Sequence, residues 1–204
     1  MNEHTKGKIR SALVIGASGG FGGAVAREFL RQGVRTRALV RPGGRQPQIH
    51  GLELVDGDVR DGESLARAAD AVDVIVNGYN VPYGRWHKEV LAATDEVLAA
   101  ARRRGATLLF PGNVYGLGPV TGGGALAEDA PRQASSALGK LRNALEDRMR
   151  EAAAQGAQVV VLRAGDYYGP GVTSSWFPHL AARAIEGGAI VDPARRADVP
   201  HAWA

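Results

Sequence analysis

Predicted strands and helices alternate along most of this chain, and that alternation limits the folds open to it. Short runs of β-branched and apolar residues are separated by stretches with apolar residues at helical spacing. Strands that alternate with helices form βαβ units, which build a parallel sheet covered by helices on both faces. The expected strands cover residues 11–16, 34–40, 52–58, 72–78, 106–112 and 157–166, and the expected helices cover 21–33, 61–71, 86–104 and 135–155.

Two of these helices carry end signals in their sequence. Asp61 is the predicted N-cap of the helix over 61–71. Arg102, Arg103 and Arg104 precede Gly105, which predicts a helix that ends with cations at its negative pole and a left-handed glycine cap. Because the other arginines are scattered, the net charge of +4 does not indicate a nucleic-acid partner.

Length and composition set the broad class. At 204 residues the chain is expected to form a single domain over residues 1–204. The absence of cysteine excludes disulfides, thiolate nucleophiles and zinc–cysteine sites, and we expect no metal site. The start is polar and no run approaches the length of a membrane span, so we expect a cytoplasmic protein without membrane contact.

The segment "LVIGASGGFGGA" (residues 13–24) fits two different chemistries. Read as G-x-S-x-G, it is the nucleophile elbow of a serine hydrolase with Ser18 as nucleophile. Read as G-x-x-G-x-x-G through Gly16, Gly19 and Gly22, it is a turn that holds a dinucleotide pyrophosphate. Both motifs lie between a strand and a helix.

The position of this segment favours the dinucleotide. Only about ten residues precede the first strand, so no earlier strand is available for an oxyanion-hole loop, and the hydrolase stays a remote alternative. Gly16 permits the tight turn, Gly19 lets the backbone approach the pyrophosphate, and Gly22 allows close helix–strand packing. The predicted cofactor contacts in this turn are Gly16, Ser18, Gly19, Gly20, Phe21 and Gly22.

The residue that reads the cofactor ribose is expected about 20 positions further on. An acidic residue there binds a 2′-hydroxyl, whereas an arginine accommodates a 2′-phosphate. This chain has Arg41 at that place, with Arg37 and Arg45 nearby and no acid. The sequence therefore predicts NADP rather than NAD as cofactor.

Five ordered motifs extend this interpretation over nearly the whole chain: "GASGGFG", "VDGDVRD", "VDVIVNG", "VYG" and "LRAGDYYGPG". With them the chain resembles the short-chain dehydrogenase/reductase superfamily, and more narrowly its extended or atypical branch, the NAD-dependent epimerase/dehydratase family. The resemblance implies an α/β fold, a Rossmann-type doubly wound parallel sheet. Relatives usually continue further, so the substrate domain is expected to be short or truncated. Part of the substrate pocket is then expected either to come from a partner subunit of a homo-oligomer or to be absent.

The resemblance also implies roles for particular residues. Asp58 and Val59 are expected to lie against the adenine, and Asn77, Gly78 and Tyr79 to line the cofactor after the fourth strand.

Further along, the resemblance implies a substrate cleft. Arg163 and the segment 168–171, which begins with Tyr168, match the part that borders the nicotinamide and the substrate. Tyr83 and Trp86 follow the fourth strand and are expected to form an aromatic wall for a small-molecule substrate. A structural anchor for the loop is the alternative for this pair.

The catalytic residues depart from the family pattern. That pattern has a tyrosine four residues before a lysine, which lowers the pKa of the phenol for proton exchange with a substrate hydroxyl. In this chain Lys140 is preceded four residues earlier by Ser136, and the hydroxyl expected at the strand end falls on Pro111. Asn113 is the nearest polar substitute.

Two functions fit this departure. The chain is an NADP-dependent oxidoreductase or epimerase-like enzyme on a small hydroxyl- or carbonyl-bearing substrate, with Tyr115 or Tyr168 as the acid and Asn113 or Lys140 as positioning donors. Alternatively, it is a non-catalytic NADP-binding regulator. The candidate catalytic residues are Asn113, Tyr115 and Lys140.

Overall fold

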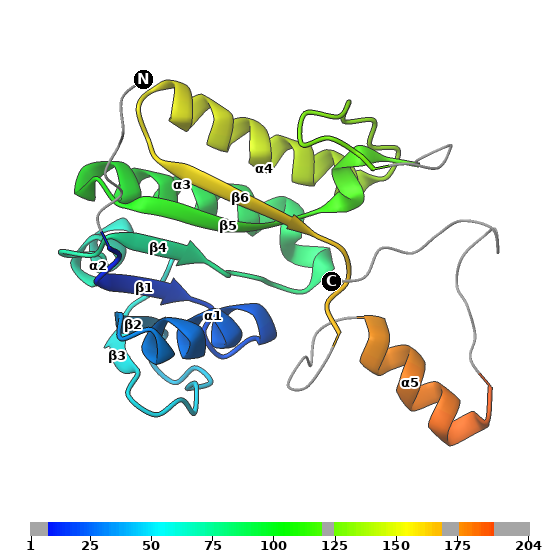
Figure 1. Cartoon of the computed structure of the whole chain (residues 1–204), viewed down its shortest axis with the longest axis horizontal. Helices are drawn as coiled ribbons and strands as arrows, with labels where there is room; N and C mark the ends of the chain where they lie inside the picture. Colours follow the sequence, from blue (N-terminus) through cyan, green and yellow to red (C-terminus); the bar gives the residue numbers. More distant parts are fainter. Residues whose placement is uncertain (1–7, 120–124, 169–175, 190–204) are drawn as a thin grey trace. The chain divides into compact units, whose positions relative to one another are not determined.

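A computed structural model describes residues 8–119, 125–168 and 176–189 of the chain (Figure 1). The chain divides into two compact units. Unit 1 comprises residues 1–110 and 150–160, and unit 2 comprises residues 111–149 and 161–204. The expectation of a single domain over residues 1–204 stays a prediction.

The sheet has the strand order β3-β2-β1-β4-β5-β6, and the pairs from β3 to β5 are all parallel. This is the order of a doubly wound dinucleotide-binding sheet, so the predicted fold class is confirmed. In register, Val14 of β1 lies opposite Ala38 of β2 on one side and Val76 of β4 on the other. The strands are β1 (Ser11–Ile15), β2 (Arg35–Val40), β3 (Glu53–Asp56), β4 (Val74–Asn77), β5 (Thr107–Asn113) and β6 (Val159–Ala164).

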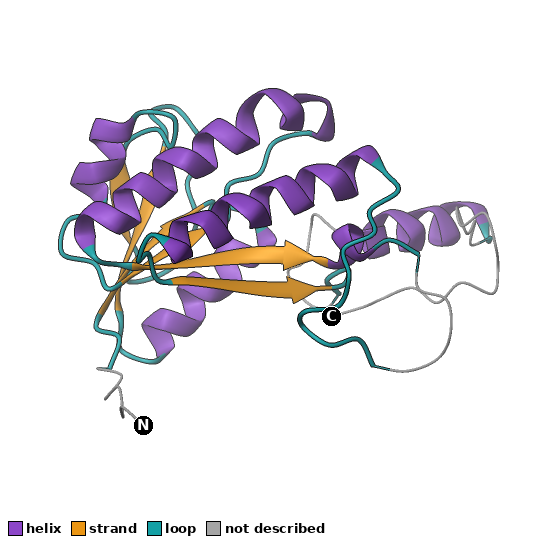
Figure 2. Ribbon diagram, turned by 90° about the horizontal axis from the view of Figure 1, so that it is seen from above, coloured by secondary structure: helices purple, strands orange, loops and turns teal. Residues whose placement is uncertain are grey.

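The central strands of unit 1 are buried on both faces. Four consecutive residues of β1, from Ala12 to Ile15, are buried, and so is the whole of β4. A strand exposed on one face would alternate apolar with polar residues, whereas residues 12–15 and 74–76 are continuously apolar. Figure 2 shows the reason, because helices flank the strands on both sides.

Three helices cover the sheet in unit 1: α1 (Gly20–Arg31), α2 (Gly62–Ala68) and α3 (Trp86–Arg104), the last preceded by the short 3₁₀ helix η1 (Tyr83–Arg85). α1 packs on β1 and β2, while α3 packs on β4 and against α2. The predicted helix ends are confirmed. The Asp61 side chain accepts a hydrogen bond from the Glu63 N–H at 3.0 Å, and Gly105 adopts a φ of +65° after α3.

Asp73 connects the start of β1 to the loop that precedes β4. One of its carboxylate oxygens accepts hydrogen bonds from the backbone N–H groups of Arg10 and Ser11, at 2.8 and 3.0 Å. The Ser11 hydroxyl lies 3.2 Å from the same oxygen. These bonds, led by that from Arg10, hold the pKa of the Asp73 carboxyl below its usual range.

Unit 2 contains the 3₁₀ helix η2 (Val114–Leu117), most of α4 (Ala137–Ala154) and α5 (Trp176–Gly187), with the second parts of β5 and β6. α4 buries an apolar stripe that includes Leu141, Leu145 and Met149. On β6 the expectation of a strand covered on both faces does not hold. Val160 and Leu162 are about half exposed, because β6 is the last strand in the sheet order of the described residues.

Within the described ranges, no helix is both long enough and apolar enough to cross a bilayer.

Asp73→Ala should destabilise the protein by about 1 kcal/mol at pH 7, because a solvent-screened carboxylate loses its hydrogen bonds. A carboxyl with a depressed pKa in the folded state stabilises above its unfolded pKa of about 3.9 and loses that effect as pH falls through the folded pKa. The difference in the free energy of unfolding between wild type and Asp73→Ala should therefore be smaller at pH 3 than at pH 7. Urea denaturation at pH 7 and at pH 3 measures the free energy of unfolding of both proteins. An equal difference at the two pH values would contradict the stabilising role of the Asp73 carboxylate.

Candidate functional site

The predicted phosphate turn joins β1 to α1. Gly16 has a φ of +78°, a left-handed conformation that residues with side chains rarely adopt. The Gly19 N–H donates to the Gly16 carbonyl oxygen at 3.0 Å, and the Gly23 N–H donates to the Gly19 carbonyl oxygen at 2.9 Å. Gly19 is therefore the N-cap of α1 and contributes no side chain to the first amides of the helix. The positive end of the helix dipole favours an anion at this place.

Three backbones meet behind this turn. A Cβ atom on Gly16 would overlap the carbonyl group of Gly78, and one on Gly22 would overlap the carbonyl group of Gly16. A Cβ atom on Gly78 would come within 2.7 Å of the Ile15 carbonyl oxygen. These glycines are thus needed for packing between β1, α1 and the end of β4.

Gly19 is less closed in than these glycines. It is exposed, and among the described residues the nearest atom to an added Cβ is the Gly16 carbonyl oxygen at 3.3 Å. A methyl group there requires the Gly16 carbonyl group to shift by a few tenths of an ångström, far less than a methyl group at Gly16, Gly22 or Gly78 would require, and it would occupy the space in which a pyrophosphate would approach the backbone. The turn therefore fits the phosphate group of a dinucleotide.

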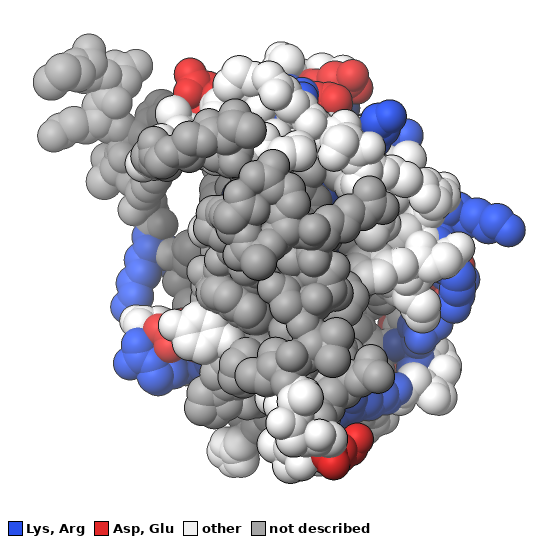
Figure 3. Space-filling model, turned by 90° about the vertical axis from the view of Figure 1, so that its right-hand side faces the viewer, with Lys and Arg blue, Asp and Glu red and all other residues white. Residues whose placement is uncertain are grey.

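The remaining residues predicted for the turn differ in exposure. Ser18 and Gly20 are partly buried, and Phe21 packs partly against the apolar core of unit 1. Figure 3 views the side toward which the strand arrows of Figure 1 point. Among the residues coloured there, Lys and Arg side chains are visible at several separate places.

Arg41 lies directly beyond the end of β2 and is exposed. It is close enough to Asp58 to contribute to lowering the pKa of that carboxyl. Arg37 is committed elsewhere, because its guanidinium lies 3.3 Å from the Glu53 carboxylate and donates to the Asp70 carbonyl oxygen at 2.9 Å. Arg41 is thus better placed than Arg37 to meet a ribose substituent.

Asp58 and Val59 follow β3. Val59 is buried, and the Asp58 carboxylate accepts hydrogen bonds from the Arg60 guanidinium, the shortest at 2.6 Å. This bond is the main reason why the pKa of Asp58 is lowered, so the group stays ionised at neutral pH. The Ser64 hydroxyl lies 3.0 Å from the Asp58 N–H and fixes the turn.

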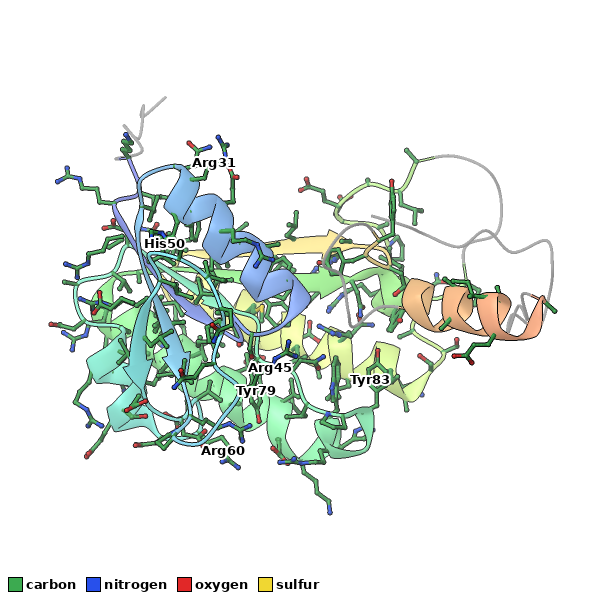
Figure 4. All side chains as sticks on the ribbon, turned by 90° about the horizontal axis from the view of Figure 1, so that it is seen from below. Arg31, Arg45, His50, Arg60, Tyr79 and Tyr83 are labelled. Atoms are coloured by element: carbon green, nitrogen blue, oxygen red, sulfur yellow. The ribbon has the colours of Figure 1, made fainter. Side chains whose placement is uncertain are left out.

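Asn77, Gly78 and Tyr79 end β4 and follow it. Asn77 is buried, and its side-chain oxygen accepts the Tyr79 N–H at 3.3 Å. The Tyr79 hydroxyl lies 3.2 Å from a Glu89 carboxylate oxygen, and burial together with this contact raises the pKa of Tyr79. Figure 4 shows Tyr79 in the region of Arg45 and Arg60, with Arg31 and His50 toward the far end of α1.

Sequence analysis missed the partners of Tyr79. Glu89 also binds the guanidinium of Arg85, and one of these contacts is 2.8 Å. Arg60 acts electrostatically on both Tyr79 and Glu89. The four-residue spacing of Arg85 and Glu89 on one helix face was the signal in the sequence that could have revealed this pair.

Tyr83 and Trp86 have different environments. Trp86 is buried, and its indole N–H lies 3.0 Å from the Asn80 side-chain oxygen and 2.6 Å from the Val81 carbonyl oxygen. It anchors the loop after β4. Tyr83 is half exposed, with its ring centre 5.2 Å from that of Trp86, so Tyr83 is the member of the pair that a substrate could reach.

In unit 2, the polar groups expected for catalysis serve local structure. The Asn113 side-chain oxygen accepts the Tyr115 N–H at 3.1 Å and thereby caps η2. The Ser136 hydroxyl accepts the Gly139 N–H at 3.0 Å at the start of α4. Lys140 is exposed, and Tyr115 is partly buried.

The segment that the resemblance places beside the nicotinamide begins with Arg163 on β6. Its guanidinium binds the buried carboxylate of Glu146 at 2.6 and 3.0 Å and donates to the Glu128 carbonyl oxygen at 2.7 Å. Tyr168 is exposed, and residues 169–171 lie outside the described residues. Within the described part of the chain, no group of three acidic or histidine side chains could hold a metal ion.

This strand order, with a glycine turn directly after β1, defines a Rossmann-type dinucleotide-binding protein. The sequence profile of the NAD dependent epimerase/dehydratase family matches residues 12–194, and the chain belongs to this family. It is 29% identical to the 2-alkyl-3-oxoalkanoate reductase of Stenotrophomonas maltophilia, and the match covers 86% of this chain and 56% of that protein.

Solved structures show the same fold. The enzyme WbmH of Bordetella bronchiseptica, in complex with NAD⁺, is 20% identical with a TM-score of 0.72 over 88% of this chain. The dTDP-glucose 4,6-dehydratase of Bacillus anthracis, in complex with NAD, is 18% identical with a TM-score of 0.73 over 87%. The chain spans 64% and 62% of these two proteins.

Gly19→Ala should weaken the binding of NADPH at least ~10-fold, because the methyl group takes the space of the pyrophosphate. Its urea midpoint should lie much closer to that of the wild type than the midpoint of Gly22→Ala, because the added methyl group makes one tight contact instead of an overlap. Gly22→Ala is the matched control and should lower the free energy of unfolding by about 1–3 kcal/mol through overpacking. Fluorescence titration and urea denaturation measure the two effects. Unchanged binding in Gly19→Ala would mean that the turn holds no cofactor.

Proposed function

We propose that the chain is an NADP-dependent oxidoreductase or epimerase-like enzyme that acts on a small hydroxyl- or carbonyl-bearing substrate. The observation that carries this proposal is the contrast within the glycine turn. Gly16 and Gly22 are closed in by backbone, whereas Gly19 leaves the first turn of α1 open to a ligand. Membership of the NAD dependent epimerase/dehydratase family supports the same assignment.

The preference for NADP rests on Arg41. An exposed guanidinium at the end of β2 attracts a 2′-phosphate and offers no acceptor to a 2′-hydroxyl. The structurally similar proteins named above are complexes with NAD, and at 18–20% identity they share the fold with this chain. Arg41 itself is the reason to expect the phosphorylated cofactor here.

The substrate class that we propose is a 3-oxo acid. The support is the reductase of S. maltophilia, whose name specifies a 2-alkyl-3-oxoalkanoate. In such a reaction a hydride from the cofactor reduces the ketone carbon and a protein group protonates the oxygen. The half-exposed ring of Tyr83 would contact the alkyl part of the substrate.

A non-catalytic NADP-binding regulator is the second candidate. It is favoured by the residues at the usual catalytic positions, because Ser136 caps α4 and Lys140 is exposed. The two candidates differ in one measurable property, which is oxidation of the bound cofactor.

Titration with NADPH and NADH, followed by an oxidation assay at 340 nm with 3-oxo acids of different chain length, tests the proposal. We expect NADPH to bind more tightly than NADH and to be oxidised in the presence of a 3-oxo acid. Tight binding without oxidation would favour the regulator. Absence of binding would contradict both candidates.

Arg41→Asp should weaken NADPH binding at least ~10-fold and leave NADH binding equal or improved, since the carboxylate repels a 2′-phosphate and accepts from a 2′-hydroxyl. Arg35→Asp, an exposed arginine at the opposite end of β2, is the matched control for the change in net charge. Fluorescence titration of both variants measures the ratio of affinities. An equal response of both cofactors to Arg41→Asp would refute the assignment of the 2′-phosphate.

A further inference from the structure

The turn after β3 lies beside the end of β2. The Gly57 N–H donates to the Val40 carbonyl oxygen at 3.0 Å, so Asp58 comes next to the place where Arg41 follows β2. The glycine turn follows β1, the neighbour of β2 on its other side. The carboxyl ends of three adjacent strands therefore present the glycine turn, then Arg41, and then Asp58.

This order corresponds to the order of groups along the cofactor. In the proposed function the pyrophosphate lies at the glycine turn and the 2′-phosphate lies at Arg41. Neighbouring strands are about 4.8 Å apart, so successive strand ends meet successive groups of an extended ligand. The base of the cofactor then falls at the turn after β3, where the sequence predicts adenine contacts by Asp58 and Val59.

Arg60 holds the carboxylate of Asp58 through three hydrogen bonds. Oδ1 accepts the Arg60 backbone N–H at 2.9 Å and the Nε–H at 3.0 Å, and Oδ2 accepts from Nη2 at 2.6 Å. Each carboxylate oxygen offers about two acceptor positions, so Oδ1 is filled and Oδ2 keeps one position for a further donor. The Asp58 side chain is 26% exposed, which leaves room for a ligand to reach it.

The backbone of this turn is fixed as well. The Asp58 N–H donates to the buried Ser64 hydroxyl at 3.0 Å, and the Asp61 N–H donates to the Asp58 carbonyl oxygen at 3.0 Å. With the backbone held by α2 and the side chain held by Arg60, the carboxylate has one defined direction.

Arg60 has a second carboxylate within electrostatic reach, that of Glu89. Both oxygens of Glu89 already accept from the Arg85 guanidinium, one of them at 2.8 Å, and the Tyr79 hydroxyl lies 3.2 Å from the same oxygen. Because these partners occupy Glu89, the Arg60 guanidinium pairs with Asp58.

We propose that Arg60 is a positioning residue that makes the base site selective for a 6-aminopurine. The inference rests on the cofactor binding of the proposed function. Arg60 fixes the Asp58 carboxylate with one acceptor position of Oδ2 directed to the ligand. The exocyclic amino group of adenine donates to that position, whereas the 6-oxo group of hypoxanthine brings an acceptor that the carboxylate repels. Arg60 acts through Asp58 and needs no contact of its own with the cofactor.

The test compares NADPH with its reduced hypoxanthine analogue, which differs only by an oxo group in place of the 6-amino group. Fluorescence titration should show that the wild type binds NADPH at least ~10-fold more tightly. In Arg60→Ala this ratio should fall at least ~3-fold, because the carboxylate loses both guanidinium bonds and keeps only the backbone bond. A merely structural role of Arg60 would weaken both dinucleotides equally.

Three further variants control the test. Arg67→Ala removes the same charge from an exposed arginine of α2 and should leave the ratio unchanged. Arg60→Lys keeps the charge but cannot make the two-point contact, so its ratio should lie between those of the wild type and Arg60→Ala. Asp58→Asn presents an amide that can donate to a 6-oxo group, and it should abolish or reverse the preference.

The outcomes separate this inference from the proposed function. Equal binding of the two dinucleotides by the wild type, or an unchanged ratio in Arg60→Ala, overturns the inference and leaves the proposed function standing. An equal loss of selectivity in Arg67→Ala also overturns it. A selective wild type that oxidises NADPH with no 3-oxo acid contradicts the proposed enzyme and leaves the role of Arg60 standing. Absence of NADPH binding overturns both.

Discussion

The contact on which the rest of unit 1 depends is the approach of three backbone segments at Gly16, Gly22 and Gly78. Close packing there brings the end of β4 against the turn between β1 and α1. A side chain at any of these positions would separate the strand ends by the width of a methyl group. Since interiors are packed at crystal-like density, such a separation could not be absorbed locally. The close backbone contacts of Gly16, Gly22 and Gly78 fix the conformation of the turn, and this conformation leaves Gly19 exposed.

Several polar side chains that follow β3 and β4 form hydrogen bonds with other side chains. Asp58 is fixed by Arg60, Tyr79 by Glu89, and the carboxylate of Glu89 also by Arg85. A cofactor that enters such a surface meets side chains whose rotamers are already set, which lowers the entropy lost on binding. Arg41, by contrast, has an exposed side chain directly after the end of β2.

The sequence was informative where a local rule controls the structure. Asp61 caps the start of α2 and Gly105 caps the end of α3, as their residue types predict. The glycine spacing also predicted the turn between β1 and α1. It was less informative on α4, where the usual catalytic pattern directs attention to Lys140. Which cation of α4 faces the sheet depends on the register between helix and strands, and that register is fixed by Glu146 and Arg163, which are 17 residues apart. The position of a residue in the sequence of the helix does not show by itself whether its side chain faces the sheet.

The Glu146–Arg163 pair fixes how α4 packs against β6. A buried ion pair contributes little net stability, because desolvation offsets most of its attraction, yet breaking it leaves a buried charge and is costly. It therefore selects one register of α4 against β6 more than it stabilises the fold.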